Sequence, residues 1–128
     1  MEKKAKILLV DDDIDFVDST RAVLESHPYE VIVAQNGDEG LRKAREDKPD
    51  LILLDVIMPV KDGFTAAEQL KQDPELQNIP TLMLTSFAAR RGETTIAVSR
   101  GLTLNAEDYI DKPVSPEELL SRIAEYLK

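Results

Sequence analysis

The sequence predicts an α/β fold, in which five parallel strands form a doubly wound open sheet with helices on both faces. Strands that are buried on both faces of such a sheet are almost uniformly apolar, and three short runs have this composition. The runs are residues 6–11, 50–55 and 80–85. They alternate with segments whose apolar residues recur at helical spacing, which is the pattern of repeated βα units. Right-handed crossovers then place the carboxyl ends of all the strands on one edge of the sheet.

Each element has its own local signal. The expected strands are 6–11, 30–34, 50–55, 80–85 and 107–111, and the expected helices are 14–27, 36–47, 62–73 and 115–127. Pro28 ends the first helix, because proline cannot continue a helix. Asn36 and Glu39 form a capping box at the start of the second helix, which Pro49 ends.

The carboxyl-terminal half continues the alternation but contains one segment without a clear pattern. Asp62 and Gly63 begin the third helix, and Asp62 is expected to be its cap. Ser115 and Glu118 form a second capping box, which begins the last helix. Segment 86–106 has a few apolar residues among glycine and threonine, so we expect a long loop and a short, irregular helix there.

Composition limits the class of protein. The 128 residues suit a single domain, 1–128, and the excess of 25 acidic over 16 basic residues gives a net charge of −9. This charge argues against direct binding to nucleic acid, whose phosphates attract lysine and arginine clusters. The chain contains no cysteine, and its basic first residues precede an apolar run that is too short for a signal peptide or a membrane span. We therefore expect a cytoplasmic protein that does not bind a membrane.

Acidic residues follow two of the predicted buried strands. The first run ends in the trio Asp11-Asp12-Asp13, and Asp55 ends the run 50–55. Carboxylates that share one edge of a sheet repel each other unless a cation or a proton lies between them. Mg²⁺ prefers oxygen ligands of this kind, so a divalent metal site is predicted at this edge.

A hydroxyl group and an amino group are expected at the same edge. Thr85 ends the fourth strand and Ser86 follows it, and Lys112 and Pro113 follow the fifth. An aspartate can act as a nucleophile and form an aspartyl phosphate. A metal ion, a lysine and a hydroxyl donor can neutralise the charge on the transferred group, so the edge suggests phosphoryl transfer.

Along nearly the whole chain, these residues resemble the receiver domains of two-component response regulators. The matching motifs are Asp11-Asp12, Asp55 with Met58-Pro59, Asp62-Gly63, Thr85, Tyr109 and Lys112-Pro113. The resemblance implies a flavodoxin-like sheet with the strand order 2-1-3-4-5. It also implies that Asp55 is the phosphoacceptor, and that Mg²⁺ is bound by Asp12 and Asp55 directly, by Asp11 largely through water, and by the backbone carbonyl of Ile57.

The resemblance also implies how the switch works. Lys112 would contact the phosphoryl group, and its peptide bond to Pro113 would be cis. Thr85 would move onto a phosphoryl oxygen, and Tyr109 would turn inward behind it. This coupled shift would reposition the surface formed by the fourth helix, the fifth strand and the last helix for binding a partner.

Several of these residues have a simpler interpretation. Asp13 is predicted to cap the first helix rather than to bind metal. His27, near the end of that helix, is expected to be a helix-end residue without a catalytic role. Thr85 could be an ordinary strand-end hydroxyl, Tyr109 a core residue and Lys112 a surface lysine.

Two departures from the family pattern affect the prediction. Twenty-six residues, 86–111, separate Thr85 from Lys112, a few more than is usual, so partner surfaces transfer poorly from other members. Ile57 and Phe87 stand where residues flank the attacking water, and neither can orient a water molecule by hydrogen bonding. We therefore expect a long-lived phosphorylated state.

The predicted function is a phosphorylation-dependent signalling switch that catalyses no reaction except its own phosphorylation and dephosphorylation. Its partners would be a histidine kinase or phosphotransfer protein and an output protein of unknown identity. The last helix reaches the end of the chain, so no output domain is expected within it. The chain would be a monomer or a phosphorylation-dependent homodimer. A Mg²⁺-dependent phosphohydrolase and a receiver-like module that is never phosphorylated remain as alternatives.

Overall fold

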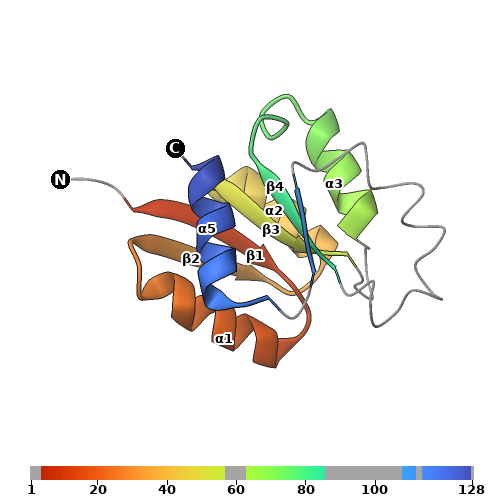
Figure 1. Ribbon diagram of the computed structural model, residues 1–128. Helices are drawn as coiled ribbons and strands as arrows, with labels where there is room; N and C mark the ends of the chain where they lie inside the picture. The colour runs from red at the N-terminus through yellow and green to blue at the C-terminus, as the bar shows by residue number, and fades with distance from the viewer. Residues whose placement is uncertain (1–3, 57–62, 86–107, 112–113, 128) are drawn as a thin grey trace.

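A parallel five-stranded sheet forms the centre of the molecule (Figure 1). The computed structural model describes residues 4–56, 63–85, 108–111 and 114–127. Its strands are β1 (Ala5–Val10), β2 (Tyr29–Ala34), β3 (Leu51–Asp55), β4 (Thr81–Thr85) and β5 (Asp108–Asp111). Its helices are α1 (Ile14–Glu25), α2 (Gly37–Asp47), α3 (Gly63–Gln72) and α5 (Pro116–Tyr126).

The strand order is β2-β1-β3-β4-β5, and every neighbouring pair is parallel. The predicted fold class and strand order are therefore confirmed. The predicted irregular helix in 86–106 and the predicted cap Asp62 lie outside the described residues. In the part of the chain that the structure describes, every helix is too short or too polar to cross a membrane.

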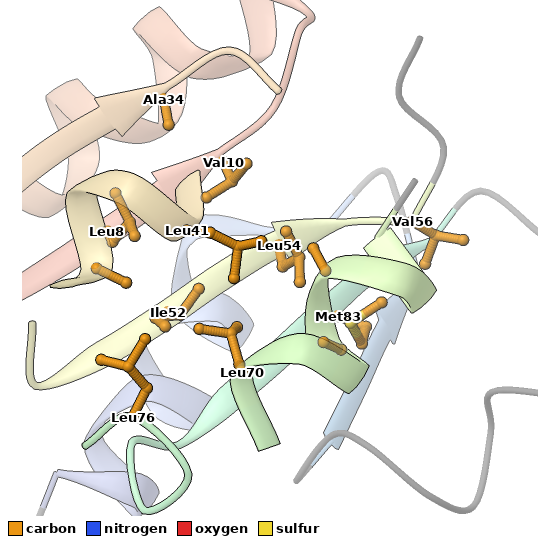
Figure 2. Packing of buried hydrophobic residues seen from close by; sticks show 13 residues of the cluster. Leu8, Val10, Ala34, Leu41, Ile52, Leu54, Val56, Leu70, Leu76 and Met83 are labelled. Atoms are coloured by element: carbon orange, nitrogen blue, oxygen red, sulfur yellow. The ribbon is translucent and has the colours of Figure 1, made fainter. Parts of the chain in front are cut away.

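Alternate residues of the central strands point to opposite faces of the sheet and pack in two separate core clusters. Leu8 and Val10 of β1 pack in the first cluster, against α2 and α3 (Figure 2). Ile7 and Leu9 pack in the second, which is completed by α1 and α5. Because both faces are covered, the middle residues of the central strands are apolar without alternation, which is the signal that predicted these strands.

The helix starts are determined by side-chain caps at the predicted residues. The carboxylate of Asp13 accepts a hydrogen bond from the backbone of Phe16 at 3.2 Å, and the side chain of Asn36 accepts one from the backbone of Glu39 at 2.9 Å. Ser115 accepts one from Glu118 at 3.1 Å. These caps satisfy amide groups that have no partner within the helix, and they fix the residues at which α1, α2 and α5 begin.

The first helix ends two residues before its predicted end. The last helical residue is Glu25, and the side chain of Ser26 donates to the carbonyl of Val23 at 2.6 Å. The exposed ring of His27 lies 3.2 Å from the same carbonyl oxygen, and Tyr29 already belongs to β2. Local side chains therefore complete this helix end before Pro28 is reached, and His27 is a helix-end residue as predicted.

Candidate functional site

The site is built where three neighbouring strands end. Val10 of β1 pairs with Leu54 of β3, so Asp11, the residue after Val10, lies beside Asp55. Asp55 in turn pairs with Leu84 of β4, which places Thr85 one residue further along the same edge. The register of the sheet therefore brings together side chains that are far apart in the sequence.

The acidic residues of this edge form a cluster. One carboxylate oxygen from each of Asp11, Asp12 and Asp55 can lie within 4.8 Å of the other two. Asp11 is 1% exposed and Asp55 is 7% exposed, whereas Asp12 is open to solvent. Two buried carboxylates at this separation repel each other strongly, because little water screens their charges. Such an arrangement is stable only when other interactions offset the repulsion, and a bound cation is the most direct of these.

The donor set fits Mg²⁺. All three side chains offer the hard oxygen ligands that this ion prefers, and the exposed position of Asp12 leaves room for water. Ligands about 2.1 Å from an octahedral Mg²⁺ lie about 3–4 Å from one another, so the oxygens of the cluster need only small movements to reach the same ion.

The backbone around Asp11 is held on two sides. Its amide group donates to the carbonyl of Ala34 in β2 at 3.0 Å, and its carboxylate accepts a hydrogen bond from the amide of Asp13 at 3.0 Å. Asp13 itself is exposed and caps α1, as the sequence predicted. Asp11 is therefore tied both to the sheet and to the first turn of a helix.

Of the remaining predicted site residues, the structure describes Thr85 and Tyr109. Thr85 is 1% exposed at the end of β4. Tyr109 is half-buried in β5 and packs against the α2–α3 side of the core, and burial raises the pKa of its phenol. Both positions are compatible with a role in the switch, and equally with an ordinary strand-end hydroxyl at Thr85 and a core residue at Tyr109. Ile57, Phe87, Lys112 and Pro113 lie outside the described residues, so the lysine contact, the cis peptide bond and the carbonyl ligand remain predictions.

A polar network between β5 and α5 was not predicted from the sequence. One oxygen of the Asp108 carboxylate accepts from the amide of Tyr109 at 2.8 Å, and the other accepts from Arg122 at 2.7 Å and from the hydroxyl of Tyr126 at 3.3 Å. Arg122 also pairs with Glu118 at 3.1 Å. The hydrogen bond and charge of Asp108 raise the pKa of Arg122. Glu118, Arg122 and Tyr126 are four residues apart, and this spacing could have predicted that they share one face of α5.

The Asp108–Arg122 pair should contribute measurably to stability. Replacing Arg122 by glutamine should lower the free energy of unfolding by about 1 kcal/mol, because a short, charged hydrogen bond is lost from a partly buried site. Arg21→Gln is the control, since its pair with Glu25 is more exposed, and it should cost less than about 0.5 kcal/mol. Urea unfolding followed by circular dichroism measures both variants, and equal losses would contradict the prediction.

An apolar groove lies between α1 and α5. It has a volume of about 150 Å³ and is lined by Phe16, Ser19, Thr20, Val23, Val114, Pro116 and Leu119. Ile14 precedes these residues on α1 and is 64% exposed, the only large apolar side chain found exposed in the described ranges. The surface formed by α1 and α5 therefore offers apolar contacts to another molecule.

Comparison with known proteins identifies relatives along the whole chain. The family model of the response regulator receiver domain matches residues 7–124. The protein PilH of Pseudomonas aeruginosa is 40% identical over 93% of this chain and 94% of its own length. The alkaline phosphatase synthesis transcriptional regulatory protein PhoP of Bacillus subtilis is 42% identical, and its match covers 96% of this chain but only 48% of PhoP. The chain thus spans nearly all of one relative and about half of another.

Solved structures agree with the sequence relatives. A putative response regulator from Chloroflexus aurantiacus has a TM-score of 0.86 and 34% identity, with 98% of each chain covered. The receiver domain of the sensor histidine kinase PA1611 from Pseudomonas aeruginosa has a TM-score of 0.84 and 26% identity, with 96% of this chain and 97% of the other covered. That structure is described as having a magnesium ion coordinated in its active-site cleft.

Proposed function

We propose that Asp55 is the residue of this chain that accepts a phosphoryl group. The chain belongs to the family of receiver domains of two-component response regulators, which are phosphorylation-dependent signalling switches. The observation that carries the proposal is the position of Asp55. It ends a central strand, is 7% exposed, and lies in one cluster with Asp11 and Asp12. A carboxylate held at this edge among other acids is suited to act as a nucleophile in a site with a bound cation.

Asp12 and Asp55 would bind Mg²⁺ directly, Asp11 would bind it largely through water, and the backbone carbonyl of Ile57 would complete the ligands from the protein. The ion would supply positive charge that offsets the negative charge of the phosphoryl oxygens. The fit of the three carboxylates to such an ion supports this assignment, as does the magnesium ion described in the PA1611 receiver domain.

In the transfer itself, a carboxylate oxygen of Asp55 attacks the phosphorus atom of a phosphohistidine. A new oxygen–phosphorus bond forms, the phosphorus–nitrogen bond breaks, and the imidazole leaves and takes up a proton. Lys112 would hold the phosphoryl oxygens with its positive charge, and its peptide bond to Pro113 would be cis. Thr85 would donate to a phosphoryl oxygen, and Tyr109 would then turn inward.

The donor would be a histidine kinase or a phosphotransfer protein in the cytoplasm, and the apolar surface around Ile14 would lie next to it during transfer. The output would be a protein that recognises the changed surface of the fourth helix, β5 and α5. We propose that the chain binds no nucleic acid or membrane itself, and that it is a monomer or a homodimer formed on phosphorylation. It would not act as an enzyme on other substrates.

Phosphorylation of the purified protein tests this proposal. Acetyl phosphate with Mg²⁺ should add one phosphoryl group, and peptide mass spectrometry should locate it on Asp55. Asp55→Asn should abolish the modification while the fold is retained. Absence of an acyl phosphate on the wild type would favour a receiver-like module that is never phosphorylated, and multiple turnover of a generic phosphoester would favour a phosphohydrolase.

A further inference from the structure

We propose that Asp13 is a positioning residue for the metal site, which acts by tying the first turn of α1 to the carboxylate of Asp11. This inference rests on the proposed Mg²⁺ site. Asp13 is not itself part of the acidic cluster, which in the described residues consists of Asp11, Asp12 and Asp55. Its effect on the ion would therefore pass through Asp11 and not through direct coordination.

Asp13 makes three hydrogen bonds, which join the carboxylate of Asp11 to the first turn of α1. Its amide group donates to Oδ1 of Asp11 at 3.0 Å, and its own Oδ1 accepts from the amide of Phe16 at 3.2 Å. Its carbonyl accepts the first hydrogen bond of the helix, from Val17, at 2.9 Å. The backbone at Asp13 is extended, with φ of −85° and ψ of 102°, and the capping bond maintains this conformation.

The conformation of Asp13 determines where its amide group points. If the capping oxygen is removed, the bond to Phe16 is lost and residue 13 can adopt other backbone conformations. Its amide group would then hold the plane of the Asp11 carboxylate less firmly. Asp11 is almost completely buried, so an ion in the cluster depends on that fixed orientation.

Asp13 also carries a negative charge, and this charge could attract a cation without any positioning. Asparagine separates the two effects, because its side-chain oxygen caps a helix about as well as aspartate does but carries no charge. Asp13→Ala removes both the cap and the charge. Two further variants complete the comparison: Asp15→Asn removes an exposed charge from the same turn, and Asn36→Ala removes the cap of α2.

Mg²⁺ titration followed by NMR measures the affinity of each variant, since the chain contains no tryptophan for fluorescence. Asp13→Ala should bind Mg²⁺ about fivefold more weakly than the wild type. This factor corresponds to the free energy that is typically lost when a helix-capping residue is replaced by alanine. Asp13→Asn, Asp15→Asn and Asn36→Ala should stay within about twofold of the wild type. If Asp13→Ala folds poorly, Asp13→Gly replaces it, because glycine is tolerated at this position but has no capping oxygen.

Hydrogen exchange provides a second measurement, because coupling between two sites is reciprocal. Mg²⁺ should slow exchange of the Phe16 amide in the wild type and in Asp13→Asn, and should have little effect on it in Asp13→Ala. Equal weakening by Asp13→Ala and Asp13→Asn would reduce the role of Asp13 to charge and overturn the inference, as would an unchanged affinity in Asp13→Ala. A wild type that does not bind Mg²⁺ at all would overturn the metal site itself.

Discussion

Asp11→Asn will weaken Mg²⁺ binding by about two orders of magnitude and, in the absence of metal, will make the protein more stable than the wild type. Both effects have the same cause. Asp11 and Asp55 are buried and their oxygens can lie within 4.8 Å of each other, together with an oxygen of Asp12. The charge that attracts the ion therefore destabilises the fold when the ion is removed.

The size of the effect follows from the separation of the charges. Two unit charges about 5 Å apart repel by about 3 kcal/mol at an effective dielectric constant of about 20. Counterions and the solvent at Asp12 reduce this value, so we expect a gain of about 1–2 kcal/mol in the metal-free protein. Asparagine retains the oxygen that accepts from the amide of Asp13, so the substitution changes charge with little change in shape.

Unfolding by urea in the presence of a chelator, and again with excess Mg²⁺, measures the prediction. The wild type should gain stability from Mg²⁺, because an ion that binds only the folded state shifts the equilibrium toward it. Asp11→Asn should gain little from the ion. Asp18→Asn is the control, since Asp18 is an exposed acid on α1 outside the cluster, and it should behave like the wild type. A loss of stability in metal-free Asp11→Asn would show that the acids do not repel each other in the folded state.

The strands and the place where the site residues meet could be predicted from the sequence. The strands show as short apolar runs, and the meeting place follows from the order of parallel strands. Runs such as 51–54 are apolar at every position, since these strands are buried on both faces. Parallel pairing then places strand ends together, so the meeting of Asp11 and Asp55 follows from the strand order alone. Helix starts at Asp13 and Ser115 were predictable as well, because a cap depends on residues three positions apart.

Interactions that are specific to the packed structure were not predictable. The carboxylate of Asp108 binds Arg122 and Tyr126 on α5, and no pattern within β5 indicates this. Glu118 was expected to complete a capping box, but its carboxylate pairs with Arg122. The burial of Asp11 beside an exposed Asp12 depends on how the chain turns from β1 into α1. In each case the hydrogen-bond partner or the burial of a side chain depends on residues that only the folded structure brings close to it.

Phosphorylated protein will lose its phosphoryl group slowly, and polar substitutions at two positions will accelerate the loss. Hydrolysis requires a water molecule to attack the phosphorus atom, after which the bond between phosphorus and the Asp55 oxygen breaks and the carboxylate is restored. Ile57 is two residues after Asp55, and Phe87 is two residues after Thr85. Both are apolar, so in the positions that the family resemblance predicts for them neither would orient the attacking water by hydrogen bonding, and both would shield the acyl phosphate from it.

Ile57→Asn and Phe87→Glu should each increase the rate of hydrolysis about tenfold, since a positioned polar group that assists proton transfer typically contributes at least this much. The measurement follows loss of the acyl phosphate by mass spectrometry after acetyl phosphate has been removed, with Mg²⁺ present. Ile57→Val and Phe87→Leu are the matched controls, because they change size but remain apolar, and they should hydrolyse slowly. A wild-type half-life of seconds would show that water reaches Asp55 despite these side chains. Equal acceleration by the apolar controls would assign the effect to shielding by size and not to the missing polar group.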